Sequence, residues 1–165
     1  MKIKVEKLTN TDLLLSAVKH VFNVEVKSSM KKWYLSEHSP IRTQLFAIYG
    51  TDVPYSVIMQ LRTHEKNGSL FLVEPGRPDT GTDRAKNQTG NYRDMPRNVF
   101  ILCNAQHLID WSRKRLCNKT EDKTRFFFNE LKNIIKEVDS ALAERMVPNC
   151  VYRGICPEFT SCGKS

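Results

Sequence analysis

The sequence predicts one α/β domain, of the α+β kind, in which helices flank a small mixed or antiparallel sheet. Segments of strand length recur along the chain, in which polar and apolar residues alternate or all residues are apolar. Amphipathic segments of helix length separate them. The 165 residues are about one domain's worth, so residues 1–165 are expected to form a single unit. No internal repeat is visible, which argues against a solenoid.

The first half is expected to alternate strands with helices. A Thr or Asp cap begins its first helix, and Pro40 ends the second by disfavouring helical backbone before it. Gly50 is expected to close a strand, and Asp52 to cap the next helix with Pro54 in its first turn. The predicted strands are 2–8, 43–50 and 67–74, and the predicted helices are 11–22, 27–37 and 52–66.

The second half begins with an unpatterned stretch, 75–98, rich in Gly, Pro and Arg, of the length that functional loops have. The apolar run 99–103 predicts a fully buried strand, and Asn104 is a suitable N-cap for a helix over 105–117. A longer amphipathic helix is expected over 121–146, completing a C-terminal helical pair. Residues 149–165 are expected to form an irregular, cysteine-containing tail.

The net charge is +8, from 26 Lys and Arg against 18 Asp and Glu, which favours an anionic partner. No block of five or six basic residues occurs, so nucleic acid is not the expected partner. No apolar run reaches the roughly 18 residues of a membrane span, and the first residues contain no apolar export signal. A reduced, cytoplasmic protein that does not enter membranes is therefore expected.

The five cysteines do not indicate a disulfide framework. Cys150, Cys156 and Cys162 are six residues apart, whereas zinc sites usually contain closer pairs. Free thiols that pack the tail are the expected state, and no metal site is predicted. A metal site with Cys117 as a fourth ligand is the alternative that the spacing leaves open.

The predicted helix 105–117 has a polar stripe beside an apolar one. At about 100° per residue, four side chains share one side of the helix: Asn104, His107, Trp111 and Arg115. This stripe is suited to a planar anionic ligand, because it offers an amide, a ring for stacking and a guanidinium. The alternative is an N-cap Asn, a partly buried Trp and solvated charges.

Other candidates are basic. Arg62 and His64 end the helix 52–66, where they either bind a ligand or complement the helix dipole. Arg77 and Arg84 in the long loop are suited to a phosphate clamp, although loop arginines are often simply solvated. No Walker loop, G-x-G-x-x-G, G-x-S-x-G or H-E-x-x-H motif is present.

Three internal segments and the tail carry a resemblance to a known enzyme family. The segments are NAQHLIDWSRKRLCNKTEDKTR (104–125), SPIRTQLF (39–46), MQLRTH (59–64) and the tail 150–163. They resemble segments of the flavin-dependent thymidylate synthases, or ThyX family. Segment 104–125 resembles the family's N-A-x-x-L followed by L-R-L-C-like and A-Q-x-E-I-R runs. Segment 39–46 resembles S-P-x-E-H-x-x-F, segment 59–64 resembles Q-x-x-R-H-R, and the tail resembles that of some members. The resemblance covers about residues 38–163 and is greatest to short members carried by bacterial viruses.

The resemblance implies an enzyme that methylates dUMP to dTMP as a homotetramer. FAD, NADPH as reductant and 5,10-methylenetetrahydrofolate are the implied cofactors, and no thiol acts as the nucleophile. By resemblance Arg115 is the catalytic residue, because it polarises the pyrimidine and stabilises its oxyanion. The implied substrate-binding residues are Arg77, Arg115, Arg125 and Gln60. The implied cofactor-binding residues are Arg62, His64, Asn104, His107 and Arg42.

The chain departs from the family pattern at several positions. Arg42 and Thr43 replace the E-H pair, and Arg62-Thr63-His64 stands for R-H-R. The nucleotide-binding S-x-R-Y has no intact match, and Pro75-Gly76-Arg77 retains only its arginine. Two alternatives therefore stay open: another C5 modification of a pyrimidine nucleotide, such as hydroxymethylation, or a non-catalytic module that binds nucleotides or nucleic acid.

Overall fold

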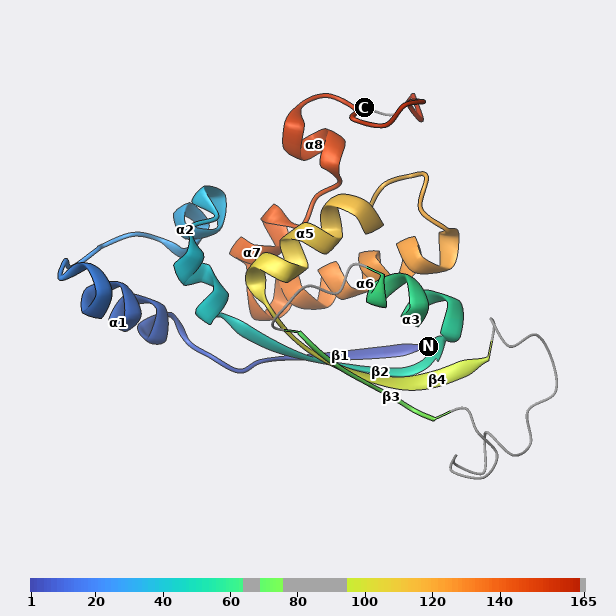
Figure 1. Ribbon diagram of the computed structural model, residues 1–165, viewed down its shortest axis with the longest axis horizontal. Coiled ribbons are helices and arrows are strands. Elements are labelled where there is room, and N and C mark those ends of the chain that lie inside the picture. Colours follow the sequence, from blue (N-terminus) through green and yellow to red (C-terminus); the bar gives the residue numbers. More distant parts are fainter. Residues whose placement is uncertain (64–68, 76–94, 164–165) are drawn as a thin grey trace.

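The computed structural model describes residues 1–63, 69–75 and 95–163, in which a four-stranded sheet has helices packed on one face (Figure 1). The strand order is β1-β2-β4-β3, and every neighbouring pair is antiparallel. The sheet is thus of the antiparallel kind, as predicted. The strands are β1 (Lys2–Lys7), β2 (Leu45–Pro54), β3 (Leu70–Val73) and β4 (Pro96–Asn104).

Figure 1 shows α3, α5, α6 and α7 on one side of the sheet, and α1 at one end of an elongated molecule. The helix α8 and the C-terminal tail lie beyond α5. No helix within the described ranges is both long and apolar enough to span a membrane. The helices are α1 (Thr11–Phe22), α2 (Met30–Ser36), the 3-10 helix η1 (Ser39–Thr43), α3 (Tyr55–Arg62), α5 (Ala105–Arg115), α6 (Asp122–Val138), α7 (Ser140–Arg145) and α8 (Asn149–Arg153).

The core lies between the inner face of the sheet and the helices. Because side chains alternate across a strand, every second residue of β4 points inward, and Val99, Ile101 and Cys103 are buried. The apolar stripe of α6 packs there, as its three-to-four-residue spacing predicts. The main helical contributors to the core are Leu108, Trp111, Phe127, Phe128, Leu131 and Ile135.

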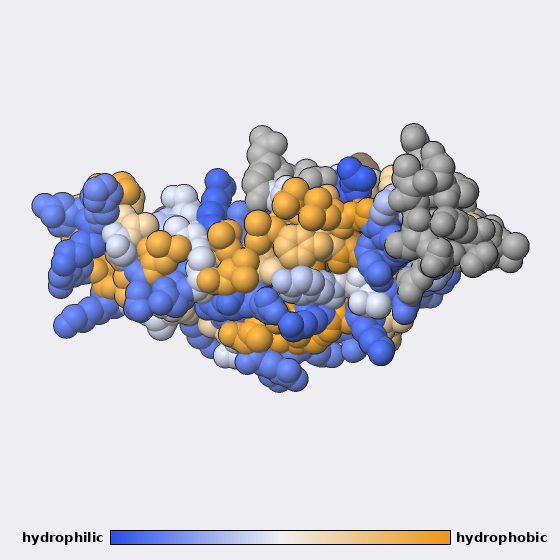
Figure 2. Space-filling view, turned by 90° about the horizontal axis from the view of Figure 1, so that it is seen from below, coloured by the Kyte–Doolittle hydropathy of each residue, from blue (hydrophilic) through white to orange (hydrophobic). Residues whose placement is uncertain are grey.

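The outer face of the sheet is apolar in its middle. The strand over 99–103 was predicted to be buried on both faces, but Phe100 and Leu102 are only half-buried because no helix of the described chain covers them. Figure 2 views the molecule from the sheet side and shows apolar side chains gathered at its centre. The pairing register places these residues side by side on the outer face: Ala47, Tyr49, Leu70, Leu72, Phe100 and Leu102.

The strand β2 does not close at Gly50, contrary to prediction. It runs to Pro54 through a bulge between Gly50 and Val53, where Asp52 adopts a φ of 55°. Asp52 therefore cannot cap α3, which begins at Tyr55 after Pro54 with no side-chain cap. Glycine is needed at position 50 for space, since a Cβ there would lie 2.7 Å from Val53 Cγ2 and 2.8 Å from Val99 Cγ1.

The predicted helix over 121–146 is two helices, because the backbone breaks at Asp139 with φ −156° and ψ 84°. The Asp139 carboxylate accepts from Lys7 Nζ and Tyr34 Oη, both at 2.7 Å, and caps α7 through Leu142 N at 3.0 Å. Its bonds to β1 and α2 hold the break in place.

Two smaller corrections concern helix ends. The helix α1 has its predicted bounds, but Asn10 is its cap and accepts from Leu13 N at 3.1 Å. The tail is not wholly irregular, since α8 forms over Asn149–Arg153 and ends at Gly154 with a φ of 75°.

Candidate active site

Arg115, in the last turn of α5, reaches across to the end of α3. Its Nη1 donates to Gln60 Oε1 at 2.7 Å and its Nη2 to Thr63 Oγ1 at 2.8 Å. The same Nη2 also donates to the backbone carbonyl of Gln60. The guanidinium, whose residue is only 9% exposed, is therefore fixed against one helix terminus.

A third helix supports this arrangement. Gln60 Nε2 donates to Glu121 Oε2 at 3.4 Å, and the same oxygen accepts from Thr124 Oγ1 at 3.1 Å. Because its amide nitrogen faces Glu121, Gln60 presents its oxygen to Arg115. Arg125 lies one turn further along α6 and binds the Asn118 carbonyl at 2.8 Å and Asp122 Oδ1 at 2.6 Å. Of the four predicted substrate-binding residues, Gln60 and Arg115 are thus in direct contact, whereas Arg125 binds its own segment through Asn118 and Asp122.

The charge of Arg115 is not balanced by these contacts. The acceptors that the described chain gives it, two from Gln60 and one from Thr63, are neutral oxygens. Burial lowers the pKa of Arg115, because desolvation disfavours the charged form. Its Nε is buried and has no hydrogen-bond partner within the described ranges. A buried cation with spare donors is suited to an anionic oxygen of a ligand.

The opposite end of α5 holds two of the predicted cofactor-binding residues, Asn104 and His107. Asn104 Oδ1 accepts from His107 N at 3.0 Å and so is the N-cap of α5, as predicted. The His107 ring is buried against Trp111, with ring centroids 4.1 Å apart, and Trp111 meets Phe71 and Phe128 edge-on. The middle of the polar stripe, His107 and Trp111, therefore faces the interior of the chain.

Three further basic candidates differ in position. Arg42 is exposed in η1, close to the start of α5, since Gln44 O accepts from Ala105 N at 2.9 Å. Arg62 is exposed in the turn that holds Arg115. Arg77 and His64 lie outside the described residues. The candidates thus form two groups, at the two ends of α5, about 16 Å apart along the helix axis by the standard rise.

Comparison with solved structures identifies the architecture. A crystal structure of the thymidylate synthase ThyX from Helicobacter pylori, with FAD and dUMP, superposes with a TM-score of 0.68 over 89% of this chain and 99% of that chain, at 10% identity. A second complex of the same enzyme with FAD and dUMP gives the same score and identity, over 89% of this chain and 100% of that chain. The fold is that of a flavin-dependent thymidylate synthase.

A related fold occurs in a second enzyme. The UMP/dUMP methylase PolB from Streptomyces cacaoi, bound with 5-Br dUMP, superposes with a TM-score of 0.58 over 87% of this chain and 94% of that chain, at 13% identity. No protein-family model and no curated protein sequence matches the chain. At 10–13% identity the likeness shows the fold alone, and the chemistry of the site depends on the residues that this chain has there.

Sequence reasoning missed two residues of the site. Thr63 was recognised only as the replacement of a family histidine, yet its hydroxyl binds Arg115. Glu121 carried no motif, and its contact with Gln60 joins segments 61 residues apart. The available signal for Thr63 was a hydroxyl residue directly after Arg62, where the helix ends. Nothing local in the sequence indicates the contact of Glu121 with Gln60.

Proposed function

We propose that this chain methylates dUMP to dTMP as a flavin-dependent thymidylate synthase-like enzyme. The observation that carries the proposal is the buried, uncompensated guanidinium of Arg115, held by neutral acceptors in a fold that occurs in two enzymes crystallised with uridine nucleotides. Uracil must gain negative charge on a carbonyl oxygen before its C5 becomes nucleophilic. A preorganised guanidinium in a water-poor site stabilises that charge most effectively.

Each residue near Arg115 has a distinct part in this proposal. Arg115 donates from its spare Nη1 hydrogen to the pyrimidine oxygen. Gln60 and Thr63 are positioning residues, because they fix the guanidinium plane from α3. Arg125 and Arg77 supply positive charge for the 5′-phosphate. Since the activation is electrostatic, no cysteine thiol is required.

The residues fit a dinucleotide cofactor through their arginines. Arg42 and Arg62 are exposed cations and would hold the phosphates of FAD, and His64 follows Arg62 by two residues in the sequence. Asn104 and His107 would meet the cofactor only at their outward edges, because the first caps α5 and the second packs on Trp111. Reduced FAD would supply the hydride, methylenetetrahydrofolate the carbon unit, and NADPH the reducing equivalents.

Assembly is the other half of the proposal. The two groups of candidates lie at opposite ends of α5, and one dUMP does not extend over the distance between them. A homotetramer would bring the end of one α5 beside a second subunit, so that nucleotide and cofactor bind across subunits. The uncovered apolar face of the sheet supports such association.

The deciding experiment is tritium release from C5-labelled dUMP by Arg115→Lys. Lysine keeps the charge but loses the planar fork, so release should fall on the order of 100-fold or more, with weaker dUMP binding. Arg153→Lys, the same change on the exposed helix α8, is the matched control and should leave release unchanged. Equal release by wild type and Arg115→Lys would show that Arg115 is a structural charge and would refute the site.

The alternatives give different results. Purified protein with a flavin absorbance band, and a product heavier than dUMP by one methylene unit, supports methylation. A product heavier by one CH2O unit indicates the hydroxymethylating alternative. Because the PolB fold serves a UMP/dUMP methylase, UMP should be assayed beside dUMP. Strongly salt-dependent binding to DNA without flavin would instead indicate a nucleic-acid-binding module.

A further inference from the structure

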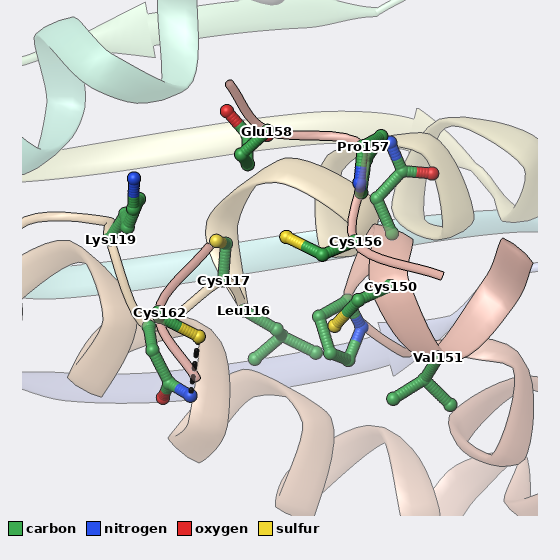
Figure 3. A pocket seen from close by; sticks show the side chains of 12 residues that line it. Leu116, Cys117, Lys119, Cys150, Val151, Cys156, Pro157, Glu158 and Cys162 are labelled. Atoms are coloured by element: carbon green, nitrogen blue, oxygen red, sulfur yellow. Dashed lines mark hydrogen bonds between the residues drawn. The ribbon is translucent and has the colours of Figure 1, made fainter. Parts of the chain in front are cut away.

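Four of the five cysteines line one cavity at the C-terminal end of α5. Cys117 comes from the turn after α5, Cys150 from α8, and Cys156 and Cys162 from the tail. Figure 3 shows their sulfur atoms arranged around the same space, which has a volume of about 80 Å³. The fifth, Cys103, is fully buried in β4 and does not line this cavity.

Three contacts hold the two sides of the cavity near each other. Thr120 N donates to Cys117 O at 2.9 Å, which closes the turn that carries Cys117. Asn118 Nδ2 donates to Cys162 Sγ at 3.8 Å, the dashed line in Figure 3. The guanidinium of Arg113 lies 3.7 Å from the ring centroid of Tyr152, which anchors α8 beside α5. Thiols far apart in the sequence are thus brought to one place by the fold.

The tail has little apolar packing to keep it there. The helix α8 buries no residue, and Val151 and Ile155 are 63% and 69% exposed. Phe159 is entirely exposed. A segment with so little buried surface needs another source of order, and a metal ion bound by thiolates supplies one in small cysteine-rich units.

We propose that Cys117, Cys150, Cys156 and Cys162 bind one zinc ion as a tetrahedral tetrathiolate that fastens the tail to α5. Each thiol loses a proton as its sulfur–zinc bond forms, so four protons are released and the site carries a charge of about −2. Lys119, which also lines the cavity, complements that charge. The six-residue spacing is compatible with this, because α8 ends at Gly154 and the chain bends there, between Cys150 and Cys156.

The site closes on metal binding. Among the described residues, no three cysteine, histidine or carboxylate side chains already stand in a metal-binding arrangement. Because Cys156 and Cys162 lie outside any helix or strand, their sulfur atoms can approach a metal ion without a shift of α5 or α6. Asn118, which already donates to Cys162 Sγ, would become a hydrogen-bond donor to a metal-bound thiolate, as residues around zinc thiolates commonly are.

The first test uses the unaltered chain. Reduced protein, freed of metal with a chelator, is titrated with zinc chloride and then with a thiol reagent. We expect one zinc per chain by elemental analysis, and four reactive thiols that zinc protects, with Cys103 unreactive in the folded protein. Cobalt in place of zinc should give thiolate charge-transfer absorption. Four thiols that react equally with and without zinc would overturn the proposal, whatever the fate of any variant.

The second test uses matched cysteine variants. Cys156→Ser and Cys162→Ser should each reduce zinc retained after dialysis to below about a tenth of the wild-type amount, because one ligand is lost. Cys103→Ala, at the cysteine outside the cavity, should retain zinc. Full retention by both tail variants overturns the proposal, as does a disulfide among the four cysteines together with no zinc uptake. Neither readout depends on dUMP or flavin, so the result is independent of the proposed enzyme activity.

Discussion

At the scale of single residues, the hydrogen bonds around Arg115 matter more than its charge alone. If the site needed only a positive charge, an exposed arginine such as Arg42 or Arg62 could supply it. Arg115 differs because Gln60 and Thr63 fix its plane. The sequence predicted Arg115 and Gln60 by family motif, whereas the role of Thr63 depends on how α3 and α5 pack.

Thr63→Val should therefore impair turnover more than binding. The change removes the hydroxyl that accepts from Arg115 Nη2 at 2.8 Å while keeping the shape of the side chain. If Thr63 is a positioning residue, kcat should fall about 10-fold or more with a smaller change in KM, since one hydrogen bond to a charged group contributes roughly 1.5–3 kcal/mol. Thr63→Ser should restore kcat. A loss of thermal stability with normal kcat would show that the hydroxyl is merely structural.

Titration of Cys103 should lower the stability of the folded protein at alkaline pH. Burial raises the pKa of Cys103 to about 12 from its ordinary value of 9.0. Below pH 9 the thiol is protonated in both the folded and unfolded states, and its effect on stability is constant. Between about pH 9 and 12 only the unfolded chain loses this proton, so the free energy of unfolding falls by up to about 1.4 kcal/mol per pH unit.

Urea unfolding near pH 8 and near pH 10 measures this dependence. Wild type should lose about 1.4 kcal/mol more than Cys103→Ala over that interval, since the variant lacks the titrating group. Comparing pH-dependent losses removes the constant cost of truncating a core side chain. Equal losses in the two proteins would mean that the thiol titrates alike in the folded and unfolded chains.

At the scale of elements, the sequence predicted helix and strand types well and their junctions poorly. The bounds of α1 and the cap of α5 follow from local signals, a periodic apolar stripe in the first case and an Asn side chain that can accept a hydrogen bond in the second. The bulge after Gly50 and the break at Asp139 depend on distant partners, Val99 in one case and Lys7 and Tyr34 in the other. Such partners are invisible to a pattern read along the chain.

Asp139→Asn tests whether one carboxylate joins three elements. The variant can still cap α7, but it no longer balances Lys7, whose side chain is only 21% exposed. We expect a loss of roughly 1–3 kcal/mol in the free energy of unfolding at neutral pH. Glu25→Gln, in the exposed pair with Lys19, is the control and should change stability by less than about 1 kcal/mol.

A double variant separates the ion pair from general damage. Because Lys7→Met removes the stranded ammonium, the combination of Lys7→Met with Asp139→Asn should cost less than the sum of the single changes. Strict additivity would mean that Lys7 and Asp139 do not interact in solution, despite the 2.7 Å separation of Lys7 Nζ and Asp139 Oδ2.

At the scale of the whole molecule, the chain has two faces with different chemistry. The inner face of the sheet, with its helices, forms the core and carries the candidate site. The outer face presents Tyr49, Leu70 and Leu72 with exposed fractions of 39%, 46% and 56%. Contiguous apolar residues rimmed by Lys4 and Glu6 are typical of an association surface, whereas single exposed apolar side chains are not.

The chain should therefore associate, and the expected assembly is a homotetramer. Sedimentation at micromolar concentration should give a mass near four times 19.1 kDa. Leu72→Glu, on the outer face of the edge strand β3, should shift the mass toward smaller species, because association would bury an unpaired carboxylate. Leu35→Glu, at an equally exposed leucine on α2, is the control and should leave the mass unchanged. A monomer mass for wild type would refute the assembly, and dissociation by Leu35→Glu alone would move the interface from the sheet to α2. Loss of C5 tritium release in parallel with dissociation would further indicate that the site needs more than one subunit.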